Sequence, residues 1–188
     1  RTAEIRVKGN PGKLTEAVAR YYYKLMAYKD EYEVARLHTD GQFLSQVKST
    51  FDGDYKLRFH LAPPLLAKRD AVTGELQKME FGAWILPVFG ILAKLKGLRG
   101  TPLDIFGYTH ERRTERQLIK DYRATIEGVL TGWTVRNYNV AGDIASIPEH
   151  IRGYGHVKDA HLKKAKEAEA ALLLSFNRPV QPEQKRAA

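Results

Sequence analysis

The sequence predicts a mainly α fold, a compact helical domain that contains one small β-ribbon. Three observations lead to this prediction. Apolar residues recur at helical spacing in several segments, the longest of which runs from Thr109 to Trp133. The period changes to two residues between Tyr55 and Leu61, where apolar and basic side chains alternate. The length of 188 residues suits one compact domain better than two.

Three helices are expected ahead of this ribbon. Thr15 is the expected N-cap of a helix that reaches about Tyr28. Asp30 can cap a second, short helix that ends near Leu37, because its carboxylate can accept a backbone N–H of the first turn. A third helical segment covers 42–51 and stops before a turn signal.

The ribbon needs a return strand to pair with the alternating segment. The first strand ends at Pro63-Pro64, and a turn is expected around Thr73-Gly74. Residues 77–81 then form the expected partner strand, with Met79 and Phe81 on one face. Because a two-stranded ribbon is marginal alone, we expect it to lie against helices.

The longest uncharged stretch runs from Phe81 to Ala93 and has 13 residues. A membrane span needs about 20 residues, so this stretch predicts a buried core helix or a strand-to-helix segment and no membrane association. Pro87 and Gly90 interrupt the stretch, which indicates a kink or a close approach of the backbone.

Helices dominate the second half of the chain. In the long helix that begins at Thr109, apolar residues trace one stripe and basic residues occupy the other side. A weaker helical segment covers 137–147, and a final helix covers 156–176. The apolar stripe consists of Leu118, Ile119, Tyr122, Ile126, Val129, Leu130 and Trp133. The residues expected to face inward on the final helix are Val157, Ala160, Ala168, Ala171 and Leu172.

Residues 14–177 are expected to form a single domain. Because the first residue is Arg1 and not Met, residues 1–13 are interpreted as a tail at a boundary with a longer chain. Residues 178–188 are rich in proline and polar side chains and are expected to form a flexible tail. No apolar run of signal-peptide length occurs near the N-terminus, and the lack of cysteine fits a reducing compartment. A cytoplasmic location is therefore expected.

The composition narrows the possible chemistry. The chain has 31 Lys and Arg against 22 Asp and Glu, a net charge of +9, which makes an acidic partner a class to consider. The absence of cysteine excludes disulfides, thiolate metal sites, Cys-ligated iron–sulfur clusters and a Cys nucleophile. Phosphate-loop, GxSxG and HExxH motifs are absent, and Gly153-Tyr154-Gly155 lacks the context of a dinucleotide-binding motif. No catalytic residue is assigned.

The histidines point to no metal site. His156 and His161 are five residues apart, so they do not share a helix face as an i, i+4 metal pair does. His60 lies with Arg58 on the polar face of the predicted strand, beside Pro63-Pro64. A catalytic His60 would imply a stand-alone hydrolase or transferase, and a surface position on an exposed ribbon is the preferred interpretation.

Basic residues gather between residues 94 and 116. Such cations can hold the phosphates of a nucleic acid or of a diphosphate cofactor. The preferred alternative is a solvated face on which Glu111 and Glu115 pair with the cations. No base-stacking platform or nucleic-acid motif accompanies them, so nucleic acid is not the expected partner. The candidate binding residues are Arg58, His60, Arg99, Arg112 and Arg113.

Four irregular strings occur in order along the chain: LMAYKDEYEVARL (25–37), FDGDYKLRFHLAPPLLA (51–67), GLRGTPLDIFGYTHERRTERQLIKDY (97–122) and IRGYGHVKDA (151–160). Together they resemble the C-terminal domain of large fused indolepyruvate ferredoxin oxidoreductases. Those enzymes belong to the thiamine-diphosphate-dependent 2-oxoacid:ferredoxin oxidoreductases. The resemblance covers the chain from about residue 12 to residue 176.

The resemblance implies a parent enzyme that converts an aryl-2-oxoacid and coenzyme A to an aryl-acyl-CoA and carbon dioxide and passes electrons to ferredoxin. It implies thiamine diphosphate, magnesium and [4Fe–4S] clusters for that parent. This chain has no GDG-type thiamine diphosphate motif and no cysteine, so the chemistry is expected elsewhere in the parent polypeptide. The chain is expected to be a non-catalytic accessory domain that packs on the catalytic body or between protomers of a homo-oligomer.

Two other functions stay open. The four candidate arginines can contact coenzyme A phosphates or steer an acidic ferredoxin within the parent enzyme. Basic charge can also support an independent nucleic-acid-binding module. The structural function predicts an exposed apolar patch that includes Trp84 or the Leu65-Leu66 pair.

Overall fold

The computed structural model describes residues 1–10, 12–63, 67 and 77–178. Within them the protein is mainly α-helical and contains one two-stranded antiparallel sheet, so the predicted fold class is confirmed. No helix in the described part of the chain combines the length and apolar composition needed to cross a membrane.

The chain divides into two compact units, which are described separately. Unit 1 comprises Arg1–Met26 and Leu118–Ala188, and unit 2 comprises Ala27–Gln117. The single domain expected over 14–177 stays a prediction. The tail expected over 178–188 lies, apart from its first residue, outside the described residues.

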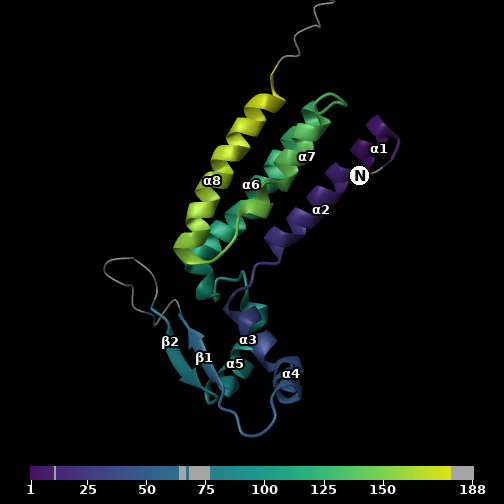
Figure 1. Ribbon diagram of the computed structural model, residues 1–188. Helices are drawn as coiled ribbons and strands as arrows, with labels where there is room; N and C mark the ends of the chain where they lie inside the picture. Colours follow the sequence, from purple (N-terminus) through teal and green to yellow (C-terminus); the bar gives the residue numbers. More distant parts are fainter. Residues whose placement is uncertain (11, 64–66, 68–76, 179–188) are drawn as a thin grey trace, which may run out of the picture. The chain divides into compact units, whose positions relative to one another are not determined.

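Unit 1 consists of helices, and α2, α6, α7 and α8 lie side by side within it (Figure 1). The sequence predicted the ends of α6, α7 and α8 to within one residue and those of α2 to within three. The elements are α1 (Thr2–Lys8), α2 (Lys13–Met26), the part of α6 (His110–Gly132) from residue 118 onward, α7 (Tyr138–Ser146), the 3₁₀ helix η3 (Ile147–His150) and α8 (Gly155–Phe176).

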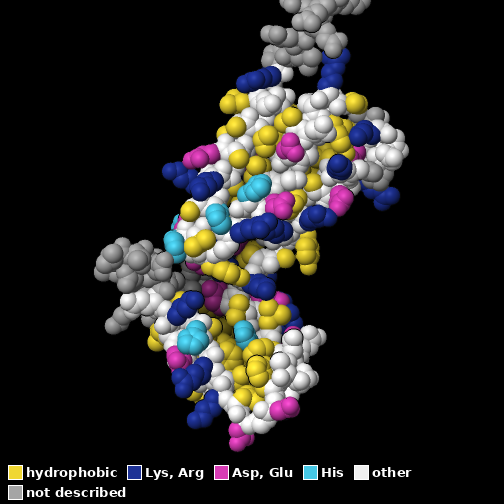
Figure 2. Space-filling view, in the orientation of Figure 1, with side chains coloured by type: hydrophobic (Ala, Val, Ile, Leu, Met, Phe, Trp, Pro, Cys, Tyr) yellow, Lys and Arg dark blue, Asp and Glu magenta, His cyan; other side chains and the backbone are white. Residues whose placement is uncertain are grey.

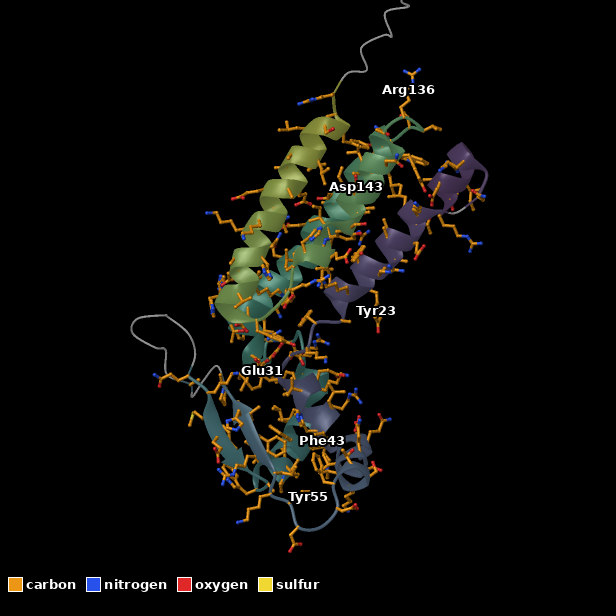
Figure 3. The ribbon with its side chains drawn as sticks, in the orientation of Figure 1. Tyr23, Glu31, Phe43, Tyr55, Arg136 and Asp143 are labelled. Carbon is orange, nitrogen blue, oxygen red and sulfur yellow. The ribbon has the colours of Figure 1, made fainter. Side chains whose placement is uncertain are left out.

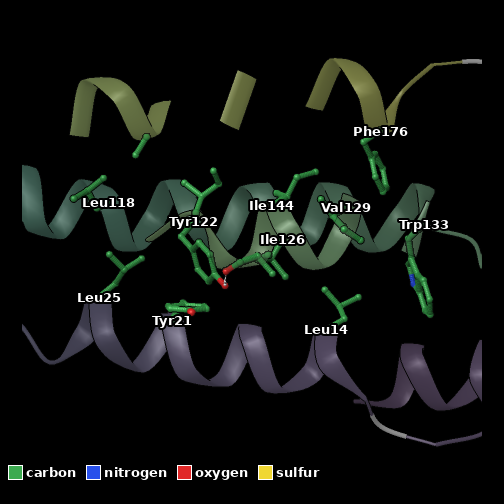
Figure 4. Packing of buried hydrophobic residues seen from close by; sticks show 14 of the residues in the cluster. Leu14, Tyr21, Leu25, Leu118, Tyr122, Ile126, Val129, Trp133, Ile144 and Phe176 are labelled. Atoms are coloured by element: carbon green, nitrogen blue, oxygen red, sulfur yellow. Dashed lines mark hydrogen bonds between the residues drawn. The ribbon is translucent and has the colours of Figure 1, made fainter. Parts of the chain in front are cut away.

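The core of unit 1 lies between α2 and the predicted stripe of α6. Leu14, Tyr21 and Leu25 are spaced to share one face of α2, and they point toward α6 (Figure 4). The hydroxyl of Tyr122 donates a hydrogen bond to a backbone carbonyl of α7 at 2.8 Å, so its polar atom is satisfied in the core. The buried stripe residues are Leu118, Tyr122, Ile126, Val129 and Trp133. The stripe was therefore predicted correctly, except that Leu130 at its edge is exposed.

The face that α8 buries differs from the expected one. The expectation of inward positions for Val157, Ala160, Ala168 and Ala171 is wrong, because all four are exposed. The buried residues of α8 are Ala165, Glu169 and Phe176, and Leu162, Leu172 and Leu173 pack against the core. Alanines occur on every side of this helix and an acidic residue lies within the buried stripe, so apolar periodicity did not mark the correct face.

A buried carboxylate holds α1, which lies in the segment expected to be a tail. Glu4 is 1% exposed and accepts hydrogen bonds from the Thr15 backbone N–H at 3.0 Å, the Tyr138 hydroxyl at 2.5 Å and the Thr15 hydroxyl. The carboxylate thereby ties α1 to α2 and α7. Thr15 lies inside the first turn of α2 and not at its N-cap position as expected, because the helix begins at Lys13. Gly12 gives the carboxylate space, since a Cβ atom there would lie 2.9 Å from both Glu4 Oε1 and the Tyr138 hydroxyl.

Unit 2 combines short helices with the β-ribbon. Asp30 caps α3 as predicted, since its carboxylate accepts the Glu33 backbone N–H at 2.8 Å. The elements are α3 (Glu31–Thr39), α4 (Gln42–Thr50), β1 (Arg58–Leu61), β2 (Met79–Gly82), α5 (Ile85–Lys94), η1 (Leu95–Leu98), η2 (Phe106–Tyr108) and the start of α6 to residue 117.

The ribbon packs on helices, which confirms the expectation that it would. Phe59 and Phe81 are paired across the antiparallel strands, and they form one buried cluster with Ala35 of α3 and with Ile85 and Phe89 of α5. Met79, expected on the same face as Phe81, is 40% exposed. The turn expected around Thr73-Gly74 lies outside the described residues.

Candidate functional site

The candidate residues of the ribbon lie on its solvent face. Arg58 is exposed, and its NH1 atom forms an ion pair with Glu80 Oε1 at 2.7 Å. His60 is exposed and lies directly opposite Glu80 in the strand register. Arg113 is exposed at the start of α6. The structure therefore places these three residues at the surface of unit 2, and it brings only Arg58 and His60 to the same strand.

Arg99 and Arg112 lie together at the start of α3. The Arg99 Nε atom is 2.6 Å from Asp30 Oδ2, and its guanidinium lies 4.4 Å from the centre of the Tyr28 ring. Arg99 also donates to the Tyr28 carbonyl at 3.4 Å. Because Asp30 is buried and caps α3, this arginine fixes the N-terminal end of that helix.

Arg112 is buried, so the solvated face preferred from the sequence is wrong at this position. Its side chain is 10% exposed and lies 3.6 Å from Glu31 and 3.5 Å from Glu111. Glu31 lies at the first position of α3 (Figure 3). Burial raises the pKa of the Glu31 carboxyl, and the positive charge of Arg112 opposes that rise. Arg112 thus neutralises a carboxylate that the fold has partly removed from water.

Asp104 organises the loop between η1 and α6. This buried carboxylate accepts the backbone N–H of Gly100 at 2.9 Å, the N–H of Gly107 at 3.0 Å and the hydroxyl of Tyr32 at 3.2 Å. Burial alone would raise its pKa, but these hydrogen bonds and the charge of Arg116 lower it. A Cβ atom on Gly107 would lie 2.6 Å from Asp104 Oδ2, so the loop requires glycine there.

These ionic groups line a recess that their own side chains fill. It leaves about 0 Å³ of free space for a water molecule, and a water needs at least about 10 Å³. Its lining residues are Tyr28, Asp30, Tyr32, Asp104, Phe106, Gly107, Arg112 and Arg116. No group of three or more metal-ligating side chains occurs among the residues that the structure describes. Because these charged groups contact one another and fill the recess, the arrangement is suited to holding unit 2 in its folded conformation.

The sequence identified two cations of this ionic cluster but not the carboxylates that pair with them. It singled out Arg99 and Arg112 as cations for a ligand but did not pair them with Asp30 and Glu31, although Asp30 was already a predicted cap. The carboxylates lie about 70 residues or more away in the sequence, and no local pattern links charges over that separation. Asp104 carried one usable signal, since its loop has glycines that can leave backbone N–H groups free to bind a carboxylate.

An exposed apolar stripe runs along α5. Trp84, Val88, Ile91 and Leu95 are 65%, 49%, 64% and 43% exposed, and their spacing of four, three and four residues places them on one side of the helix. Ile85 and Phe89 cover the opposite, buried side. Residues 81–93 form the strand-to-helix segment that was one of the two expectations, and its helix is buried on one face only. We call the four exposed residues the α5 stripe.

Two candidates were predicted for an exposed apolar patch, and the α5 stripe contains one of them. Trp84 is exposed as predicted, whereas the Leu65-Leu66 pair lies outside the described residues. The other three members were missed because residues 85–93 are apolar all around the helix, so the sequence does not distinguish the buried face from the exposed one.

The fold and these contacts define a mainly α-helical protein of two compact units, one of which contains a buried ionic cluster and an exposed apolar helix face. The chain belongs to DUF6537, a family of unknown function, whose model matches residues 1–171. No curated protein and no solved structure matches the chain.

Proposed function

We propose that this chain is a non-catalytic accessory domain of a thiamine-diphosphate-dependent 2-oxoacid:ferredoxin oxidoreductase of the indolepyruvate type. The four sequence strings that resemble such enzymes support the assignment to a parent of this kind. In that parent, thiamine diphosphate with magnesium supplies the carbanion chemistry and [4Fe–4S] clusters transfer electrons. This chain has no cysteine with which to ligate a cluster. Its own role is to dock against the rest of the polypeptide.

The α5 stripe is the observation that carries this proposal. Soluble proteins rarely leave a continuous apolar surface in water without a partner. Hydrophobic side chains lie on the surface of the unit that contains the ribbon and α5 (Figure 2). The catalytic body of the same polypeptide is the proposed occupant, because a covalently attached partner is present at high effective concentration and a small apolar face then suffices.

The buried ionic cluster supports a structural role as well. Asp30 and Glu31 belong to the string at 25–37, and Arg99 and Arg112 belong to the string at 97–122. Two of the strings that carry the resemblance thus meet in ion pairs that hold unit 2 together. Their residues are used within the domain, which favours a structural function over coenzyme A or ferredoxin binding at these arginines.

The proposal is tested in the oxidoreductase polypeptide that contains this domain. Ile91→Asp introduces a charge into the proposed interface, and Leu174→Asp is the matched control on α8, because Leu174 is exposed to a similar extent. A carboxylate buried in an apolar contact costs at least about 2 kcal/mol, so the undocked population should rise about thirtyfold. Limited proteolysis between the domain and the catalytic body measures this rise.

Equal cleavage of the Ile91→Asp and Leu174→Asp enzymes would contradict the docking role. The isolated chain provides a second test of the proposal. It should fold, as judged by far-UV circular dichroism, and should not reduce a viologen dye with indolepyruvate, coenzyme A and thiamine diphosphate. Turnover by the purified chain would disprove the non-catalytic assignment.

A further inference from the structure

The chain contains two Asp-Gly pairs, and both lie in unit 2. Asp40-Gly41 separates α3 from α4, and Asp52-Gly53 lies in the connection from α4 to β1. Both glycines have a positive φ angle, 87° at Gly41 and 81° at Gly53, and a Cβ atom at either position would meet no atom within 4 Å. The two glycines are therefore alike, so a difference in chemistry between the pairs must come from the surroundings of each aspartate.

An Asp-Gly pair can rearrange without an enzyme. The backbone nitrogen of the glycine attacks the side-chain Cγ of the aspartate, a C–N bond forms, and the carboxyl hydroxyl group leaves with the amide proton as water. The product is a cyclic succinimide. Water then adds to either ring carbonyl and breaks a C–N bond, which gives aspartate or isoaspartate. Glycine favours ring closure because it has no Cβ atom beside its nitrogen and its backbone rotates freely. The cycle releases and consumes water and needs no oxidant or cofactor.

The carboxylate of Asp40 is held by two contacts. Its Oδ1 atom accepts the Gln42 backbone N–H at 3.0 Å, and its Oδ2 atom lies 3.3 Å from Arg36 NH1. The backbone is held as well, because the Asp40 N–H donates to the Arg36 carbonyl at 2.9 Å and the Gly41 carbonyl accepts the Ser45 N–H at 3.1 Å. Since one carboxyl oxygen leaves during ring closure, the reaction at Asp40 must break at least one of its two side-chain contacts.

The carboxylate of Asp52 has no such contacts. Within the described residues, neither Asp52 nor Gly53 forms a hydrogen bond or an ion pair, and both are exposed. The connection 51–57 contains no helix or strand, and the rings of Phe51 and Tyr55 contact each other across the pair with their centres 6.5 Å apart (Figure 3 labels Tyr55). The Asp52 side chain can therefore rotate toward the Gly53 nitrogen without losing a partner.

We propose that Asp52 is a site of spontaneous isomerisation to isoaspartate in the folded protein, and that the fold protects Asp40 from the same reaction. A hydrogen bond to a charged group that must break before ring closure slows the reaction at Asp40 by at least about tenfold relative to Asp52. The product carries the side-chain methylene in its main chain, so the connection between α4 and β1 becomes longer. The proposal does not depend on the function of the parent enzyme.

The test follows both pairs in the folded chain, incubated in neutral buffer made with heavy-oxygen water. Each ring opening adds a heavy oxygen atom, which mass spectrometry detects, and an isoaspartyl methyltransferase with S-adenosylmethionine labels the isoaspartyl product. Trypsin cleaves after Arg36, Lys48 and Lys56, so the two pairs fall in separate peptides, 37–48 and 49–56. We expect peptide 49–56 to acquire both labels at least about tenfold faster than peptide 37–48.

Two controls identify the cause. Incubation in concentrated urea removes the contacts of Asp40, so the rates at the two pairs should become similar. Asp52→Glu keeps the charge but would need a larger ring, so it should abolish the label in peptide 49–56; circular dichroism confirms that the variant is folded. Three results would overturn the proposal: labelling of the two peptides at equal rates in the folded chain, the same rate ratio in urea, or label in peptide 49–56 that persists in Asp52→Glu and so belongs to Asp54.

Discussion

Replacing Glu4 by Gln should destabilise unit 1 by about 3 kcal/mol at neutral pH. The hydrogen bonds from Thr15 and Tyr138 outweigh burial, which alone would raise the pKa of this carboxyl, and the net effect lowers it from 4.5 to about 2. Each pKa unit corresponds to about 1.4 kcal/mol. Because Glu4 is 1% exposed, water cannot replace the contacts that the substitution removes.

The pH dependence follows from the sign of the shift. A carboxyl whose pKa is lower in the folded state stabilises the fold fully above its unfolded pKa, and it loses this contribution as the pH falls toward the folded value. The wild-type protein should therefore lose about 3 kcal/mol between pH 5 and pH 2 from this group. The Glu4→Gln variant lacks the titration, so the difference between the two proteins should shrink as the pH falls.

Urea unfolding followed by tryptophan fluorescence measures the effect. In a Trp84→Phe background the signal comes from Trp133, which is buried in unit 1 with its ring centre 5.9 Å from that of Tyr138. Glu16→Gln is the control, because Glu16 is exposed and forms an exposed ion pair with Arg20, and it should cost less than about 0.5 kcal/mol. A Glu4→Gln effect below 1 kcal/mol at pH 7, or one that is the same at pH 2.5, would refute the reasoning.

Three further substitutions test single contacts by urea unfolding. Gly107→Ala should cost about 2 kcal/mol, because the new methyl group overlaps a carboxylate oxygen of Asp104; a cost that persists unchanged beside Asp104→Ala would contradict this cause. Arg112→Met should cost about 3 kcal/mol by leaving Glu31 buried without its cation; adding Glu31→Gln should recover part of the loss, and no recovery would argue against the pair. Lys24→Met should cost about 2 kcal/mol, since three carbonyls lose their donor; an unchanged midpoint would show that water replaces the ammonium.

Sequence patterns correctly predicted the features of the fold that are set by residues close together in the chain. Asp30 was identified as a cap because the preference for a short acceptor at this position comes from the helix end itself. The stripe of α6 was identified because large apolar residues at helical spacing have one way to be buried. Both features follow from residues within a few turns of each other.

Features that depend on distant partners were missed. The helix at residues 2–8 is held by the hydrogen bond that the Tyr138 hydroxyl of α7 donates to Glu4. No residue near Glu4 in the sequence indicates that contact. The face of α8 was predicted wrongly because Glu169, a buried member of its stripe, is satisfied by Thr125 of α6 at 3.1 Å and by Lys166 at 2.8 Å. A buried charge with such partners is invisible to a hydrophobic pattern.

The candidate site shows that the surroundings of an arginine in the fold, and not the number of arginines, decide whether it can bind an anion. Arg99 and Arg112 looked equivalent to Arg113 in the sequence, but the first two are engaged with carboxylates and only the third is exposed. Reversing the charge of Arg99 or Arg112 would place two like charges together in the folded domain, so any loss of ligand binding would report unfolding. Tests of anion binding therefore belong on exposed cations such as Arg152, whose replacement leaves the ionic cluster of unit 2 untouched.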